Sequence, residues 1–357
     1  MPVTHDYLTP DIFDAFRCKC GACRANCCRG WTVTLSLGEY YRLLGLPCPA
    51  SWRRKLDDAL YVLPDGRDRQ RFARLDKDGE GRCRLQKPDG LCGLQCTCGE
   101  TALPAVCRMY PRGPRSLLGY VCANACSCEA VVEQLMAREE PMTFRRARLS
   151  FPLDAEEACL PETDCLAAEA GRMAAVRCVQ DRSRPLAERL IRLTGELAAS
   201  ACDTPRSSQQ ALDTLLELLR AVRKHSAAVD RTLNALGAGD TPAMTLDDQQ
   251  QQAALMASRL PRWEVWLEQL LVNHMTFTCF PDSERRMDKR SACLALDAVY
   301  ALLRLLALKC ADEQSFADMA AALFRHVEHS DFALETAAFL RAEGFEGEKQ
   351  VSAMLLL

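Results

Sequence analysis

Fourteen of the chain's 21 cysteines fall within its first 128 residues. The first five are spaced as Cys18-x-Cys20-x2-Cys23-x3-Cys27-Cys28. Two adjacent cysteines bridge to each other only with strain, so Cys27 and Cys28 each need a distant partner or a metal. Short internal spacings of this kind are what zinc sites and iron–sulfur clusters require. We therefore expect the N-terminal third to be organised around its thiols rather than around a hydrophobic core.

The rest of the sequence indicates the cellular compartment of these thiols and excludes some classes of partner. With 357 residues the chain is long enough for two domains, and its net charge of −3 argues against a general nucleic-acid binder. The first residues lack the basic start and apolar run of a secretory signal. The longest apolar candidate for a membrane span, 301–308, is interrupted by Arg304. We expect a cytoplasmic protein without nucleic-acid or membrane partners, in which thiols stay reduced and disulfides are rare.

The N-terminal third is punctuated by Gly, Pro and Cys, which favours loops and short elements over long helices. Ser36 and Glu39 have the spacing of a capping box, which predicts a helix over 37–44 that ends at Gly45. A small hairpin is expected over 72–85. This part of the chain therefore contains few elements that bury a large apolar face.

Beyond this region the pattern becomes helical, with apolar residues at three- and four-residue steps. The pattern predicts helices over 129–138, 166–182, 186–201, 207–236, 246–271, 291–310 and 313–343. The predicted fold class is mainly α. An irregular cysteine-rich metal-binding region (1–130) is expected to pack, through a linker (131–165), on an all-α helical region (166–357). The seven cysteines after residue 128 are scattered, and we expect them to be buried apolar residues.

Three further cysteine groups follow the first five. They are Cys83-x-Leu85 with Asp89-Gly90-x-Cys92, then Cys107-x2-Tyr110-Pro111-Arg112, then Cys122-x3-Cys126-x-Cys128. These groups follow the segment Phe16-x-Cys18-x4-Cys23-x3-Cys27-Cys28-x-Gly30-Trp31. Together the blocks resemble the flagellin lysine-N-methylase family over about residues 7–130. That family belongs to a wider group with a zinc- or iron-chelating CxxCxxCC domain. Two brief segments of the C-terminal half, 266–273 and 328–330, resemble the same methylase.

The resemblance implies N-methylation of lysine side chains on flagellin, with S-adenosylmethionine as donor and a [4Fe-4S] cluster bound by cysteines. The candidate ligands are Cys18, Cys23, Cys27, Cys28, Cys83, Cys92, Cys107 and either Cys126 or Cys128. The last choice stays open because Cys128 is followed by Glu-Ala without the proline of the family. Four thiolates complete either a cubane or a tetrahedral zinc site, and spacing does not say which four act together.

Two common cofactor-binding patterns are missing from the sequence. A radical S-adenosylmethionine enzyme would have Cys-x3-Cys-x2-Cys, which none of the cysteine groups matches. A Rossmann-type methyltransferase would have a glycine-rich turn between a strand and a helix. The nearest candidate, 237–239, lies between two predicted helices and is interpreted as a plain interhelical turn. We therefore expect a cofactor site of another kind.

Methyl transfer requires a neutral lysine amine, although the reference pKa of lysine is about 10.4. Tyr110 and Glu39 lie near the cysteine blocks and are the candidate catalytic groups, because a tyrosine or carboxylate beside a desolvated lysine channel can accept the proton of the amine. Arg108 and Arg112 are candidates for binding a cofactor carboxylate. The alternatives are that Tyr110 packs against neighbours and that both arginines are structural or solvated.

Two other function classes share the same cysteine pattern. One is a non-enzymatic zinc- or iron-binding protein, and the other is a redox protein that contains the chelating domain. The long helical region favours the enzyme, since a bare chelating protein does not need some 200 further residues able to form a substrate groove.

Overall fold

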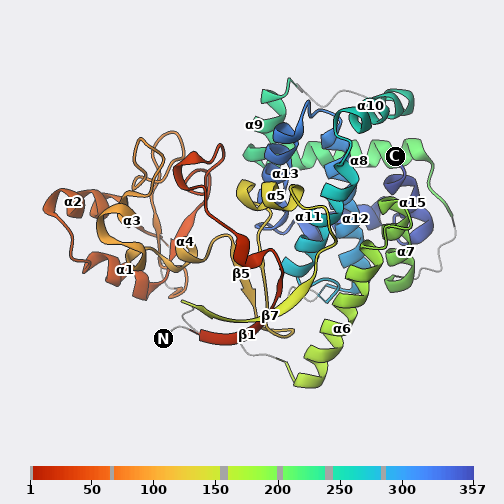
Figure 1. The fold of residues 1–357 in the computed structure, drawn as a ribbon. Helices are drawn as coiled ribbons and strands as arrows, with labels where there is room; N and C mark the ends of the chain where they lie inside the picture. The colour runs from red at the N-terminus through yellow and green to blue at the C-terminus, as the bar shows by residue number, and fades with distance from the viewer. Residues whose placement is uncertain (1–2, 65–67, 153–159, 199–203, 238–243, 283–286) are drawn as a thin grey trace. The chain divides into compact units, whose positions relative to one another are not determined.

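The computed structural model describes residues 3–64, 68–152, 160–198, 204–237, 244–282 and 287–357 (Figure 1). Within these residues it contains 15 α-helices, a four-stranded sheet and a three-stranded sheet. The prediction of a mainly α protein with a cysteine-rich, irregular N-terminal region is confirmed.

The chain divides into two compact units. The first, called here the cysteine-rich unit, consists mainly of Arg17–Tyr110. The second, called the helical unit, consists of Val3–Phe16, Pro111–Ser150 and Ala155–Leu357. The boundaries expected near residues 130 and 166 remain predictions about the domains of this chain.

The cysteine-rich unit is built on a small antiparallel sheet with β4 (Ala73–Leu75) in the middle. Its neighbours are β2 (Val33–Leu35) and β3 (Leu60–Val62). Four short helices surround it: α1 (Leu37–Leu44), α2 (Ala50–Ala59), α3 (Gly93–Cys98) and α4 (Ala105–Met109). The apolar core of this unit contains only ten fully buried residues, as its sequence suggested.

Local signals in this unit predicted one element well and another poorly. The capping box forms, because Ser36 Oγ accepts from Glu39 N at 3.3 Å and Glu39 Oε2 accepts from Ser36 N at 3.0 Å. The helix it begins ends at Gly45 as predicted. The hairpin over 72–85 is reduced to one bridge between Lys77 and Cys83. Its first strand, β4, is already paired along both edges, so the second arm has no edge to extend.

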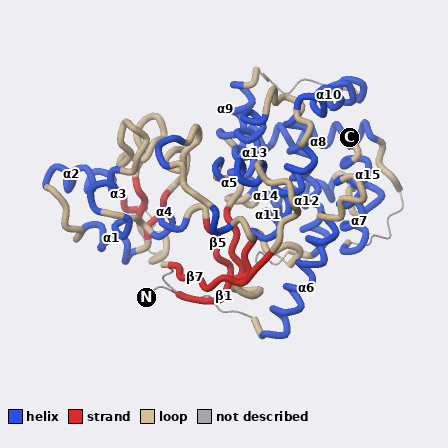
Figure 2. The backbone as a smooth tube through the Cα atoms, viewed as in Figure 1, coloured by secondary structure: helices blue, strands red, loops and turns tan. Residues whose placement is uncertain are grey.

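The four-stranded sheet lies in the helical unit and was not predicted (Figure 2). Its order is β5 (Arg112–Arg115), β6 (Val121–Asn124), β1 (Val3–Pro10) and β7 (Phe144–Phe151). β1 runs parallel to β6, with Leu8 opposite Val121, whereas β5 and β6 are antiparallel. β5 and β6 have four residues each, and the parallel pair β1 and β6 joins segments more than 100 positions apart, so no local hairpin signal predicts the whole sheet.

The described residues of this unit also form eleven helices. They are α5 (Glu129–Met136), α6 (Glu162–Val179), α7 (Leu186–Leu197), α8 (Ser208–His225), α9 (Ala227–Ala235), α10 (Leu246–Arg259), α11 (Trp263–Phe277), α12 (Lys289–Ala307), α13 (Glu313–Val327), α14 (Phe332–Ala342) and α15 (Glu348–Leu355). No helix in the described parts of the chain combines the length and apolar character that crossing a bilayer requires.

Three of the predicted helices are each divided in two, and α15 was not predicted. Ser226 ends α8 and caps α9, since its hydroxyl accepts from Val229 N at 3.4 Å. Pro261 separates α10 from α11 because proline has no backbone donor and its ring disfavours a helical conformation before it. The apolar periodicity continues across these breaks and so did not predict them, because both helices that replace each predicted helix contribute to the core.

The core of the helical unit is large and mostly aliphatic, with α12 buried along nearly its whole length. Trp266 and Leu270 of α11 are both fully buried and lie four residues apart, in keeping with the three- and four-residue apolar spacing of the predicted helices. Of the later cysteines that the structure describes, Cys178, Cys279, Cys293 and Cys310 are buried and Cys165 is half-buried; positions 159 and 202 lie outside the described residues.

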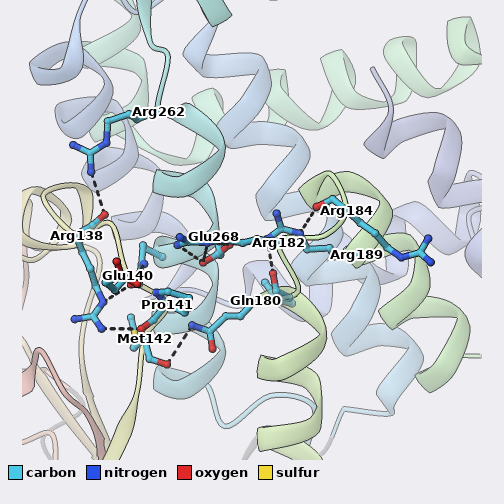
Figure 3. A network of polar contacts seen from close by, with 12 residues as sticks. Arg138, Glu140, Pro141, Met142, Gln180, Arg182, Arg184, Arg189, Arg262 and Glu268 are labelled. Atoms are coloured by element: carbon cyan, nitrogen blue, oxygen red, sulfur yellow. Dashed lines mark hydrogen bonds and ion pairs between the residues drawn. The ribbon is translucent and has the colours of Figure 1, made fainter.

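One buried charge cluster ties α6, α7 and α11 together (Figure 3). The Glu268 carboxylate is nearly inaccessible and accepts from Arg182 at 2.8 Å and from Arg189 at 2.6 Å. Arg189 also donates to the carbonyl oxygens of Val179 and Arg184. A buried carboxylate is tolerable only when it is paired and hydrogen-bonded in this way.

Candidate functional site

The cysteine blocks of the cysteine-rich unit are joined by their backbones. Cys28 O accepts from Cys83 N at 2.7 Å, and Gly30 N donates to Gly81 O at 3.0 Å. The backbone of Gly21, in the first cysteine group, also lies close to that of Asp89, because a Cβ added at Gly21 would be 2.6 Å from Asp89 O. The first loop and the segment 81–92 therefore run against each other, although some 50 residues separate them in sequence.

Five thiols from three of the cysteine groups act on one another electrostatically. The pKa of Cys28 is raised by a hydrogen bond with Cys27, by burial, and by the charges of Cys27, Cys83 and Cys92. Burial raises the pKa of Cys107, and the charges of Cys27, Cys92 and Cys83 raise it further. We call Cys27, Cys28, Cys83, Cys92 and Cys107 the thiol cluster. Mutual repulsion of this kind is relieved when a cation takes the place of the thiol protons.

The thiol cluster has the chemistry of a metal site but not the geometry of a single bound ion. No disulfide joins any cysteine that the structure describes. Across the described residues, no three His, Cys, Asp or Glu side chains are set to hold one metal ion. Tetrahedral zinc, with Zn–S bonds of about 2.3 Å, would draw its sulfurs to about 3.8 Å from one another. A cubane holds its cysteine sulfurs farther apart because iron and sulfide lie between them.

One further predicted ligand, Cys18, acts on the thiol cluster, because its pKa is raised by burial and also by the charges of Cys20 and Cys27. Cys18 and Cys23 belong to the same first loop, where Cys20 N donates to Cys18 Sγ at 3.3 Å. Cys126 and Cys128 belong to the helical unit. Cys126 is fully buried there, and its pKa is raised well above the ordinary value by burial and by the charge of Glu328. All nine ligand assignments stay predictions.

Three cysteines outside the family pattern are also placed by the structure. Cys48 and Cys98 form a separate pair, since burial and then the charge and hydrogen bond of Cys48 raise the pKa of Cys98. Cys96 lies near Cys92, whose pKa is raised by burial and also by the charge of Cys96. Substitution of Cys48, which pairs with Cys98 rather than with the thiol cluster, can therefore serve as a control for substitutions within the cluster.

The candidate catalytic groups Glu39 and Tyr110 have structural partners in the cysteine-rich unit. Glu39 Oε1 accepts from Ala105 N at 2.7 Å, so its carboxylate joins the starts of α1 and α4. The Tyr110 ring packs on Trp31, with centroids 5.8 Å apart. These contacts agree with the packing alternative for Tyr110, and the catalytic assignments remain predictions.

The two candidate cofactor-binding arginines lie in different units. Arg108 is in the last turn of α4, and its buried Nε has no hydrogen-bond partner among the described residues. Arg112 begins β5 in the helical unit, where its guanidinium lies 5.9 Å from the centre of the Phe16 ring. The charges of Arg112 and Arg115 partly offset the burial that raises the pKa of Cys122 to about 12.

A second candidate site lies within the helical unit, at the two short segments that resemble the methylase. Glu328 follows α13, and its Oε1 accepts from Cys126 N at 3.2 Å while Oε2 accepts from Ser127 N at 3.0 Å. His274 of α11 places Nδ1 3.3 Å from Glu328 Oε1. Glu328 therefore links the loop after β6 to α11 through a single buried carboxylate.

Neighbouring side chains extend this buried polar cluster. Ser127 Oγ and His329 Nε2 are 2.9 Å apart. Asn273 Nδ2 donates to Asn124 O at 2.7 Å and to Cys126 Sγ at 3.1 Å. The segments 266–273 and 328–330, far apart in the sequence, thus meet beside Cys126. The sequence analysis identifies both segments by their resemblance but assigns no role to His274 or His329, since neither histidine has a motif around it.

A cavity of about 180 Å³ opens next to this cluster. Its polar lining comes from His274, Thr278, Glu328 and Arg115. Its apolar lining includes Phe277, Phe280, Leu296, Val299 and Phe332. The pocket therefore combines apolar side chains with several polar and charged groups, as ligand sites do.

The sequence is similar to parts of lysine-N-methylases and of a flagellar biosynthetic protein. It is 29% identical over 103 residues to a lysine-N-methylase of Salmonella typhimurium and 30% identical over 103 residues to that of Salmonella choleraesuis. Each match covers 29% of this chain and 25% of the relative, so the chain spans about a quarter of the length of these methylases.

A third relative matches over a longer stretch. The chain is 27% identical over 144 residues, 38% of its length, to the flagellar biosynthetic protein FliU of Salmonella muenchen, of which the match covers 84%. No family model matches the sequence, and no solved structure matches it either. The resemblance to the flagellin lysine-N-methylase family, expected from the cysteine blocks, is thereby confirmed over part of the chain.

Proposed function

We propose that this protein is a protein-lysine N-methyltransferase that acts on flagellin, takes its methyl group from S-adenosylmethionine and carries a [4Fe-4S] cluster. The observation that carries the proposal is the match to two lysine-N-methylases. The match to a flagellar biosynthetic protein supports flagellin as the partner. Because the matches are partial, the activity, the substrate and the cluster are all proposed here for this chain.

The donor set of the cysteine-rich unit fits a cluster. The thiol cluster offers five sulfurs, one more than a cubane requires, from loops that share no large core. Such a cluster would cross-link these loops and supply an electron-transfer centre, and Cys18 and Cys23 would be its remaining candidate ligands. Zinc is the alternative occupant, because four thiolates also complete a tetrahedral zinc site.

Arg108 supports the proposal for the methyl donor. A buried guanidinium N–H without a partner is costly, and a ligand carboxylate such as that of S-adenosylmethionine would satisfy it. Arg112 remains the second proposed contact. A cytoplasmic location is proposed because the described cysteines are all thiols, which a reducing compartment maintains.

The test is anaerobic purification, followed by iron, zinc and sulfide analysis and a methylation assay with flagellin and S-adenosylmethionine. We expect about four irons and four sulfides per chain, and flagellin peptides heavier by one or more methyl groups on lysine. Cys28→Ser should lower the iron content and the methyl transfer together. Cys48→Ser, a change of the same kind outside the thiol cluster, should leave both unchanged.

The thiol cluster by itself also favours a second candidate, a metal-binding protein without catalytic activity. Full metal loading with no methyl transfer to flagellin would support that candidate and contradict the enzyme. A visible band that bleaches on reduction and returns on oxidation, again without methyl transfer, would instead indicate the redox alternative.

A further inference from the structure

The cavity of the helical unit has an apolar floor and a more polar rim. Val299 of α12 and Phe332 of α14 line it and are almost inaccessible to solvent. Arg115, Thr278 and Met287 also line it but are only half-buried, so they lie nearer to its opening. The volume of about 180 Å³ therefore extends from solvent into the core, which suits a ligand with one polar end and one apolar end.

The charge that an occupant of this cavity would meet is positive. Glu328 also belongs to the lining, but the exposed fraction of its side chain is 0%. Its carboxylate is occupied by two backbone N–H groups and by the His274 ring. Among the lining residues that the structure describes, an occupant therefore meets the guanidinium of Arg115 and no accessible carboxylate.

Phe277 sets the position of this guanidinium. Arg115 Nε donates to Phe277 O at 3.2 Å, and the guanidinium lies 4.9 Å from the centre of the Phe277 ring. The same ring packs against Gly113, two residues earlier on the same side of β5, where a Cβ would collide with it. A guanidinium has five N–H donors, so the bond from Nε is compatible with a carboxylate at its other edge. Because β5 and α11 hold the cation in place, an anion that binds it orders little further side chain.

From these observations we infer that the cavity lined by Arg115, Phe280, Val299 and Phe332 binds an aliphatic carboxylate. The carboxylate pairs with the Arg115 guanidinium at the rim, and the alkyl chain lies along the apolar residues of α12 and α14. No covalent bond is made or broken, so the site is one of binding alone. The inference goes beyond the proposed function, because neither the flagellin lysine nor the methyl donor is assigned to this cavity and its test needs no methyl transfer.

The first test uses the full, unaltered chain and varies the probe. Ligand-observed NMR compares n-hexanoate with n-hexanol and n-hexylamine, and with the shorter anions n-butanoate and acetate. We expect n-hexanoate to bind about tenfold more tightly than n-hexanol, because a hydrogen bond to a charged group contributes about that factor, and n-hexylamine to bind most weakly. Each methylene that is buried should tighten the binding of the carboxylate about fourfold. Equal binding of the alcohol or the amine, or binding that does not depend on chain length, would overturn the inference.

The second test locates the binding at the rim. Arg115→Met removes the charge from the cavity, and Arg148→Met makes the same change at an exposed position of β7 in the same sheet. Arg115→Met should weaken the binding of n-hexanoate about tenfold and leave that of n-hexanol unchanged, which would show that the cavity is intact. Arg148→Met should change neither, and Arg115→Lys, which keeps the charge, should recover part of the affinity. Binding of n-hexanoate that is indifferent to Arg115→Met would contradict the site.

A third pair of variants tests the apolar floor and covers the case in which Arg115→Met does not fold. Ala333→Leu narrows the cavity from α14, and Ala338→Leu places the same change on the exposed face of that helix. Ala333→Leu should weaken the binding of n-hexanoate and n-hexanol alike, because both place their chains in the same space, whereas Ala338→Leu should weaken neither. If the two variants bound n-hexanoate equally well, its chain would lie outside this cavity and the inference would be wrong.

Discussion

The two units of this protein differ in the size of their apolar cores and in how their polar groups are arranged. The cysteine-rich unit contains a small sheet, short helices and ten fully buried apolar residues, while its thiols meet between loops. The helical unit contains a core several times larger, in which charged groups such as Glu268 are each surrounded by partners. The difference indicates that apolar burial stabilises the second unit more than the first, and the proposed metal would supply order that the small core of the first unit does not.

The largest effect should follow removal of the proposed metal. Structural metal ligation contributes on the order of 10 kcal/mol to folding in small domains. In the full chain, chelation or Cys28→Ser should expose 17–110 to proteolysis while the helices after residue 160 stay protected, as mapped by mass spectrometry of the fragments. Cys48→Ser serves as the control. If both units lost protection together, the proposed independence of their stabilities would be wrong.

A large pH effect is expected in the helical unit. Burial raises the pKa of Asp297 to about 8, although a hydrogen bond from Thr194 at 2.8 Å opposes the shift. In the unfolded chain an aspartate has a pKa of about 3.9. The folded state therefore holds this proton up to about pH 8, and the stability that the protonated group allows is lost as the pH rises from about 4 to about 8.

Asp297→Asn should remove this pH dependence. The variant is expected to exceed the wild type in unfolding free energy by an amount that grows from near zero at about pH 4 to on the order of 5 kcal/mol at about pH 8. Urea unfolding at several pH values measures the difference. A constant difference across this range would show that Asp297 is ionised in the folded protein.

The next effect concerns the buried charges of the same unit. Glu268→Gln leaves Arg189 buried without a counter-charge and should cost about 3–5 kcal/mol of unfolding free energy. Glu196→Gln breaks an exposed pair with Arg192 on α7 and should cost about 0–1 kcal/mol. Denaturant titrations of both variants make the comparison. Equal costs would mean that the Glu268 cluster does not join α6, α7 and α11 as described.

The smallest effect should be the same in both units. Ser36→Ala and Ser207→Ala each remove the hydroxyl of a capping box, one in each unit. Each loss is expected to cost about 1 kcal/mol because a cap acts only on the first turn of its own helix. Local hydrogen exchange at α1 and α8 measures these costs. A much larger opening at α1 than at α8 would show that the cysteine-rich unit is marginal even with its metal bound.

Local rules predicted the features that depend on a few neighbouring residues. The capping box at Ser36 and the buried stripe through Trp266 and Leu270 both follow from three- and four-residue spacings. Periodicity missed the breaks at Ser226 and Pro261, because helices that share a core keep a similar apolar pattern across a turn. It also missed the four-stranded sheet, whose parallel pair joins residues more than 100 positions apart.

The sequence by itself determined that the chain is mainly helical, that its N-terminal third is rich in thiols, and that those thiols occur in the order typical of one family. The tertiary structure decided which thiols meet, that Cys126 belongs to the helical unit, and that His274 and Glu328 share a buried cluster beside a cavity. The reason is physical. Helix periodicity and caps arise from contacts within a turn, whereas the meeting of residues 50 to 200 positions apart depends on how whole elements pack.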